Sequence, residues 1–163
     1  MDISKLTEHD LPSLADLFRQ FWGKNSSLEK MRATFTRLAS NPSYILLTAK
    51  QDDRLVGFAM GIICEELYGD CKPFMVIEDL IVDKKQRRNR AGSALMQELE
   101  KCAIVHDCCQ ILFVTEEDRS EAHQFYGSLG YKFEPYKGFK KRIEGGQQVI
   151  SALEEQIQNG GGQ

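Results

Sequence analysis

The chain has 163 residues, of which 42% are hydrophobic and 28% are charged, and its formal net charge is -3. A chain of this length is expected to form one domain, and it can bury a full core without metal or disulfide cross-links. The composition excludes a disordered protein, and the net charge gives no overall field that would attract nucleic acid or an anionic membrane. Any basic site must therefore be local.

The sequence also lacks targeting and cross-linking signals. The first residues show no charged segment followed by an apolar run, and no stretch approaches the roughly 20 apolar residues of a membrane span. We therefore expect a cytoplasmic protein that does not bind a membrane. The five cysteines are an odd number without CxxC spacing, and the three histidines lie far apart. This pattern predicts no disulfide framework and no metal site, and it favours reduced, mostly buried cysteines.

The first half of the chain predicts a short strand, two amphipathic helices and a β-hairpin. Apolar residues recur at intervals of three and four in the helices, whereas the hairpin strands are apolar, β-rich runs joined by a polar turn. Asn41-Pro42 ends the second helix. In chain order, these elements cover residues 1–7, 9–22, 27–38, 44–49 and 55–64.

The second half predicts strands that alternate with helices and then a tail. An acidic, turn-rich stretch leads into a strand that becomes fully apolar, as a central strand does. The predicted elements are a strand over 74–82, a helix over 91–106, a strand over 109–114, a helix over 120–129 and a strand pair over 131–143. The order predicts an α/β (α+β) fold with one domain over residues 1–143. Residues 144–163 are expected to form a partly helical or flexible tail.

A cluster of cations lies where the apolar strand meets the next helix. Residues 84–90 (KKQRRNR) hold five cations, and the small residues Ala91, Gly92 and Ser93 follow. Because a helix N-terminus has unpaired N–H groups and about half a positive charge, this junction predicts a phosphate site. A solvated basic turn is one alternative. A nucleic-acid patch is another, which the lack of interleaved aromatic residues weakens.

The same junction resembles a family signature. Residues 87–92 (RRNRAG) fit the Gln/Arg-x-x-Gly-x-Gly/Ala motif of the GNAT family of N-acetyltransferases, which binds the pyrophosphate of coenzyme A. Arg90 stands where the family usually has its first Gly, which lets the backbone approach the pyrophosphate. Two consequences are open: strain in the loop, or an added phosphate contact from the guanidinium.

Two further segments resemble the same family. Residues 77–82 (IEDLIV) resemble the fourth strand of its small-amine members, which bulges and splays from its neighbour, and whose backbone binds the pantetheine arm and polarises the thioester carbonyl. Residues 122–131 resemble the A-x-x-F-Y-x-x-x-G-F/Y segment, whose second aromatic, here Tyr126, protonates the leaving thiolate. Arg119 replaces an Asn that often contacts pantetheine. The cofactor-binding residues that the resemblance implies are Leu80, Ile81, Val82, Arg87, Arg88, Asn89, Arg90, Ala91, Gly92 and Ser93.

The three motifs together imply a fold and an activity. The fold would be a mixed, mostly antiparallel sheet of six or seven strands flanked by about four helices. The activity would be direct transfer of an acetyl group from acetyl-CoA to a small amine in a ternary complex, without a metal, and a homodimer is left open. The alternatives are a coenzyme A-binding module with weak or no catalysis, or a nucleic-acid binder that uses the basic loop.

Carboxylates supply the remaining chemistry. An ammonium must lose a proton before it attacks a thioester, and Glu78 and Asp79 are the candidate bases. Because neighbouring residues of a regular strand face opposite sides, only one of them is expected to face the cleft, and the resemblance favours Glu78. An ordinary ion pair is the alternative for both carboxylates, and core packing is the alternative for Tyr126.

More acidic residues precede the same strand, at Glu65, Glu66 and Asp70. With Glu78 and Asp79 they would make the mouth of the acceptor side negative, which attracts cations. We therefore expect a cationic acceptor bound by Glu65, Glu66 and Asp79. The alternative is that the loop acids are simply solvated.

Overall fold

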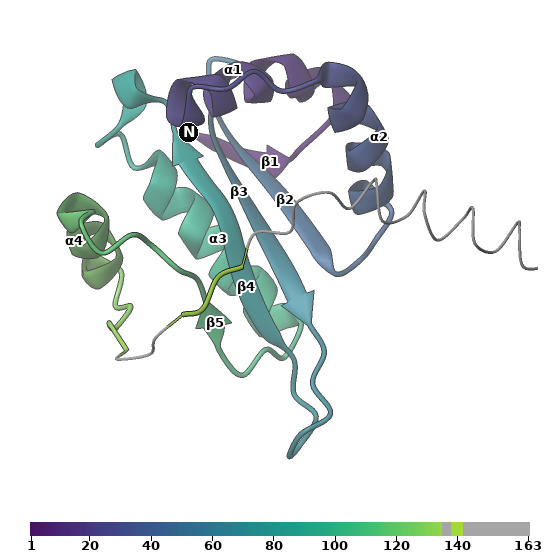
Figure 1. Cartoon of the computed structure of the whole chain (residues 1–163), viewed down its shortest axis with the longest axis vertical. Coiled ribbons are helices and arrows are strands. Elements are labelled where there is room, and N and C mark those ends of the chain that lie inside the picture. The colour runs from purple at the N-terminus through teal and green to yellow at the C-terminus, as the bar shows by residue number, and fades with distance from the viewer. Residues whose placement is uncertain (135–137, 142–163) are drawn as a thin grey trace, which may run out of the picture. The chain divides into compact units, whose positions relative to one another are not determined.

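The computed structural model describes residues 1–134 and 138–141, and the chain divides into two units, residues 1–125 and residues 126–163. The first unit contains a sheet whose strands lie side by side in their sequence order (Figure 1). The strands are β1 (Asp2–Lys5), β2 (Tyr44–Gln51), β3 (Arg54–Cys64), β4 (Phe74–Val82) and β5 (Ile111–Leu112). The pairs from β1 to β4 are antiparallel, whereas β5 runs parallel to β4. The predicted mixed, mostly antiparallel sheet is therefore confirmed.

The helices follow the predicted periodicity closely. Pro12 lies in the first turn of α1, where its missing N–H costs no helical hydrogen bond, and Gly23 ends α1 with φ of +71°. Ser27 caps α2 by accepting the N–H of Lys30. The α-helices of the described residues are α1 (Leu11–Trp22), α2 (Leu28–Ala39), α3 (Ala91–Val105) and α4 (Ser120–Ser128), and the short 3-10 helices are η1 (Glu8–Asp10) and η2 (Lys84–Gln86).

The sheet has one helix layer on each face. Phe58 and Ile81, which are cross-strand partners, pack with the buried leucines of α1. On the opposite face of β3, a Cβ at Gly61 would lie 2.9 Å from the Leu99 side chain of α3. Gly61 thus lets α3 approach the sheet, and the core lies between the sheet and these two helices.

The structure corrects several predictions about the sheet and the cysteines. The described sheet has five strands rather than six or seven, because residues 131–134 and 138–141 have no regular secondary structure. Phe133 and Phe139 are exposed there rather than buried as in a core strand. The strand expected over 109–114 pairs with β4 only at Ile111 and Leu112, which form β5. The chain on either side of these two residues forms no ladder pair with β4. The five cysteines are free, but they are half-buried or exposed rather than buried.

The remaining predictions about the end of the chain lie outside the described residues. These are the part of the expected strand pair at 135–137, 142 and 143, the domain boundary at 143 and the tail over 144–163. The boundary and the tail therefore stay predictions.

Candidate active site

The two parallel strands of the sheet separate halfway along β4. β4 and β5 pair only at Met75 with Ile111 and at Val76 with Leu112. From Ile77 onward, β4 keeps its partner β3 on one edge, and the other edge has no strand partner among the described residues. The divergence expected from the resemblance is therefore present, and it leaves polar backbone groups along one edge of β4.

The direction of these backbone groups follows from one hydrogen bond. The Asp83 N–H donates to the Val56 carbonyl oxygen of β3 at 2.8 Å. Because successive residues of a strand turn their N–H and C=O groups to opposite edges, those of Val82 point away from β3. They face the edge at which β5 no longer pairs.

A β-bulge interrupts β4 at its two acidic residues. Phe58 pairs with Ile81 and Met60 pairs with Glu78, so two residues of β4, Asp79 and Leu80, oppose the single residue of β3 between them. Asp79 has φ of +57°, in the left-handed region. A bulge breaks the alternation of side chains. The expectation that only one of the two carboxylates faces the cleft assumed a regular strand, and β4 is not regular there.

The two carboxylates differ in environment. Glu78 is exposed and lies on the sheet face of its partner Met60, which packs against the α1 cluster. Asp79 is half-buried, and burial raises the pKa of its carboxyl, with a further rise from the nearby charge of Glu78. The charge of Glu78 therefore affects the ionisation of Asp79. The Glu78 side chain is open to solvent, whereas the Asp79 side chain is partly withdrawn from it.

The basic loop connects β4 to α3, and side-chain hydrogen bonds restrain it. Asp83 caps η2, and the Asn89 amide donates to the Gln86 side chain at 2.9 Å. Arg88 and Arg90 have φ of +66° and +63°, a conformation that costs a non-glycine residue about 1–2 kcal/mol. Strain at Arg90, one of the two open consequences of the missing Gly, is therefore present. The side chains of Arg87, Arg88 and Arg90 are exposed.

The loop ends at an open helix N-terminus. Arg90 is the N-cap of α3, and its side chain makes no capping hydrogen bond to the first turn of this helix. The first N–H groups of a helix have no intrahelical partner, so those of α3 are suited to an anion. Gly92 lies in this turn, where a Cβ would come within 3.2 Å of the Phe125 ring. A larger residue at position 92 would therefore need the Phe125 ring to shift by a few tenths of an ångström.

The acidic loop residues lie at the other end of β4. Glu65, Glu66 and Asp70 are exposed in the β3–β4 connection, which Figure 1 shows extending beyond the sheet at the end opposite the basic loop. Glu65 directly follows Cys64, the cross-strand partner of Phe74 at the start of β4. Opposite charges thus lie at the two ends of the strand that holds Glu78 and Asp79.

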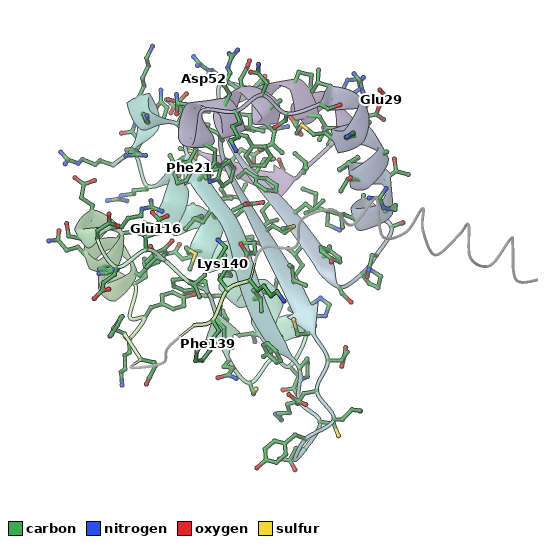
Figure 2. The ribbon with its side chains drawn as sticks, viewed as in Figure 1. Phe21, Glu29, Asp52, Glu116, Phe139 and Lys140 are labelled. Atoms are coloured by element: carbon green, nitrogen blue, oxygen red, sulfur yellow. The ribbon has the colours of Figure 1, made fainter. Side chains whose placement is uncertain are left out.

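Two predicted residues lie on or near α4. Tyr126 is half-buried in α4 and belongs to the second unit, where its ring lies 6.4 Å from that of Tyr131. Arg119, in the first unit, places its guanidinium 5.3 Å from the ring centre of Phe21. Phe21, labelled in Figure 2, packs against the core cluster that includes Ile81. Arg119 thus links the segment after β5 to α1, a contact that the sequence pattern does not reveal.

An unpaired hydroxyl lies in the segment that continues from β5. Among the described residues, the buried Oγ1 of Thr115 has no hydrogen-bond partner. An unsatisfied buried polar group costs about 1–3 kcal/mol, so such an atom suits a ligand that would pair with it. The open edge of β4 and the start of α3 are compatible with the arm and pyrophosphate of coenzyme A. No sequence motif marks Thr115.

Other kinds of site find little support in the described part of the chain. A groove of about 550 Å³ lies beside α1 and the end of β4, away from Glu78, and Asp16, Arg54 and Asp83 are among its lining residues. No three acidic, histidine or cysteine side chains of the described residues are grouped to hold a metal ion. None of the described helices is long and apolar enough to cross a membrane.

Comparisons with solved structures place this fold among known ones. A glucosamine-6-phosphate N-acetyltransferase from Arabidopsis thaliana superposes with a TM-score of 0.78 at 18% identity, covering 87% of this chain and 98% of that one. An aminoglycoside acetyltransferase from an uncultured soil metagenomic sample, in complex with sisomicin, has a TM-score of 0.74 at 20% identity, with 88% and 96% covered. A transcriptional regulator from Bacillus halodurans C-125 has a TM-score of 0.78 at 21% identity, with 87% and 99% covered. These similarities show the fold.

Comparison with sequences identifies the family. No curated protein matches the chain in sequence. The sequence model described as the acetyltransferase (GNAT) family matches residues 11–131, most of the chain and all three motifs. The chain therefore belongs to the acetyltransferase (GNAT) family, whose members are acetyl-CoA-dependent N-acetyltransferases.

Proposed function

We propose that this protein transfers the acetyl group of acetyl-CoA directly to a small cationic amine while both substrates are bound. The observation that carries the proposal is the bulged half of β4, residues 78–82. It combines two carboxylates with a backbone edge that has no strand partner in the described part of the chain, and it runs into the basic loop. A cytoplasmic location and a homodimer stay predictions.

The donor would bind along this edge and at the start of α3. The backbone of Leu80, Ile81 and Val82 would pair with the pantetheine arm, as the family resemblance implies. The pyrophosphate would meet the N–H groups at Ala91, Gly92 and Ser93, with the loop arginines and Asn89 around it. The first turn of α3, where the Arg90 side chain makes no capping hydrogen bond, supports this assignment.

Glu78 and Tyr126 would move the two protons of the reaction. Glu78, directly or through water, takes the proton of the acceptor ammonium, and the amine nitrogen then attacks the thioester carbonyl carbon. Backbone N–H groups of β4 stabilise the charge that develops on the carbonyl oxygen. As the C–S bond breaks, Tyr126 gives its phenolic proton to the thiolate, and the extra proton on the attacking nitrogen then restores the phenol, so the amide product is neutral. A phenol with a pKa near 10 is well matched to an alkyl thiolate.

The charges around β4 support a cationic acceptor. Glu65 and Glu66 are exposed beside the start of β4, and Asp79 is half-buried at its bulge. Such a series of carboxylates concentrates ammonium groups near the base. The solved acetyltransferase of this fold that was crystallised with sisomicin acts on aminoglycosides, which carry several ammonium groups. Polyamines, aminoglycosides and basic amino acids are therefore the proposed acceptor classes.

An amine panel tests the proposal. Release of the coenzyme A thiol from acetyl-CoA is measured with cationic, neutral and anionic amines, for the wild type and for Tyr126→Phe. We expect a preference for cationic amines, and a turnover lowered about 10²- to 10⁴-fold in the variant with little change in coenzyme A affinity. Turnover within twofold of the wild type would return Tyr126 to a packing role. Coenzyme A binding without turnover on any amine would favour a binding module.

A further inference from the structure

A buried carboxylate lies where β4 ends and the basic loop begins. Asp83 is only 7% exposed, although it follows directly after the open edge of β4 and precedes five exposed cations. A buried charge is costly unless it is paired and hydrogen-bonded. The partners of Asp83 therefore indicate why an ionisable residue is kept at this position.

The shortest contact of the Asp83 carboxylate is to the backbone of the loop. Its Oδ1 accepts the Lys85 N–H at 2.8 Å, and the Gln20 amide nitrogen lies 3.4 Å from the same oxygen. The ion pair to Arg54 is longer, at 3.6 Å, and the Arg54 side chain is 72% exposed. An ion pair at this distance, with its cation largely in solvent, contributes little to stability. Holding the loop is thus the main interaction of this carboxylate.

Gln20 of α1 holds the neighbouring loop residue. Its Oε1 accepts the Lys84 N–H at 2.9 Å. Two consecutive N–H groups of the loop are therefore bound by side chains from two different elements, the end of β4 and helix α1. These bonds restrict the start of the loop, while Arg90 leads into the open N-terminus of α3.

We propose that Asp83 and Gln20 are positioning residues that hold the basic loop in the conformation that receives the coenzyme A pyrophosphate. This inference rests on the proposed function. Neither side chain would touch the donor. Without them the loop samples other conformations, and binding must then order it, which weakens affinity without changing the chemistry at β4.

The test compares four variants of the full-length protein. Coenzyme A affinity is measured by calorimetry, and the KM for acetyl-CoA and kcat are measured for Asp83→Ala, Asp83→Asn, Gln20→Ala and Asp16→Ala. Asp16 is the matched control, because it lines the same groove and carries an ion pair, at 2.9 Å to Arg19, but holds no loop residue. If Asp83→Ala does not fold, Gln20→Ala tests the inference in its place.

We expect Asp83→Ala to weaken coenzyme A binding about tenfold and to raise the KM for acetyl-CoA by the same factor, with kcat within twofold. Asp83→Asn keeps an acceptor for the Lys85 N–H and should recover part of the loss. Gln20→Ala should weaken binding several-fold, and Asp16→Ala should match the wild type. The inference would be overturned if the folded Asp83 or Gln20 variants bound coenzyme A as tightly as Asp16→Ala does. A loss in kcat alone would also overturn it. Failure of the wild type to bind coenzyme A would instead overturn the proposed function.

Discussion

The first and second halves of β4 have opposite surroundings. In the first half, Met75 is fully buried and pairs with β3 on one side and β5 on the other. In the second half, Glu78 is exposed and Asp79 has a positive φ. Among the described strands, only β3 pairs with this half. One strand therefore stabilises the fold at its start and offers carboxylates and polar backbone at its end.

The difference shows how a core strand can also carry a site. Regular pairing and burial at Met75 hold β4 in place, so the bulge at Asp79 need not contribute to stability. A strained backbone and a partly buried carboxyl both cost free energy, and they persist where the surrounding structure determines the conformation. Substitutions in the first half should therefore change stability, and substitutions in the second half should change activity.

The largest effect is expected at Glu78. Glu78→Gln removes the proposed base, and the rate at neutral pH should fall about 10²- to 10⁴-fold. At higher pH more of the amine arrives deprotonated, so the loss should shrink. Because Glu78 is exposed, the free energy of unfolding should stay within about 0.5 kcal/mol. A pH–rate profile with a denaturation curve checks both points, and a rate loss independent of pH would contradict the assignment.

The opposite result is expected at Met75. Met75→Ala creates a cavity in the core between the sheet and α3, and it should lower the free energy of unfolding by about 2–5 kcal/mol. The coenzyme A affinity of the folded protein should be unchanged. Urea unfolding and calorimetry measure the two quantities. If the folded Met75→Ala variant bound coenzyme A more weakly than the wild type, the two halves of β4 would not act independently.

The sequence predicts the regular elements well and the site incompletely. Helical spacing locates α1 and α3 because most of their apolar residues lie on the buried faces, although Ile104, near the end of α3, is exposed. The length of β5 could not be read from its apolar run, because a strand ends where its partner diverges, and that is a property of the sheet. For the same reason, alternation failed at Glu78 and Asp79, where a bulge shifts the register.

Contacts between distant elements were not predictable from local pattern. Nothing near Gln20 in the sequence indicates that its side chain meets the Lys84 N–H. Asp83 had a partial signal, since Asp is a favoured cap residue and it lies between a buried strand and a basic turn. The unpaired hydroxyl of Thr115 had none, because hydrogen-bond satisfaction depends on the folded surroundings.

A smaller effect is expected where β4 leads into the basic loop. Arg87→Ala or Arg88→Ala should weaken acetyl-CoA binding about tenfold, and added salt should narrow the difference from the wild type. Lys101→Ala is a suitable control, because Lys101 is an exposed cation of α3 that pairs with Glu98 far from the N-terminus of the helix. Calorimetry at two salt concentrations measures these affinities. Wild-type affinity in both arginine variants would remove the loop from the donor site.

Strain at Arg90 should lower the free energy of unfolding, so a substitution that relieves it should raise this free energy. Arg90→Gly relieves a left-handed residue, worth about 1–2 kcal/mol, but it also adds conformational freedom to the unfolded chain, worth about 0.4–1 kcal/mol. We therefore expect a net gain of about 0.5–1 kcal/mol in the free energy of unfolding. Arg87→Gly, at a position with φ of -62°, should instead destabilise the fold. Urea unfolding of both variants gives the comparison, and equal effects would rule out strain at Arg90.

The smallest effect is expected at Asp79, and its sign depends on pH. Burial, together with the charge of Glu78, raises the pKa of Asp79 in the folded state. The folded protein therefore binds this proton more tightly than the unfolded chain, so stability from this group is present below the unfolded pKa and is lost as the pH rises through the folded pKa.

Asp79→Asn removes the ionisation, so the variant should unfold at a higher temperature than the wild type at neutral pH. This difference should disappear at acidic pH, where the wild-type carboxyl is protonated. The gain is small because Asp79 is only half-buried. If Asp79 also binds the acceptor, the same variant should raise the KM for cationic amines. Thermal unfolding from acidic to neutral pH tests the linkage, and a variant less stable than the wild type at neutral pH would show that the Asp79 carboxylate supports the bulge.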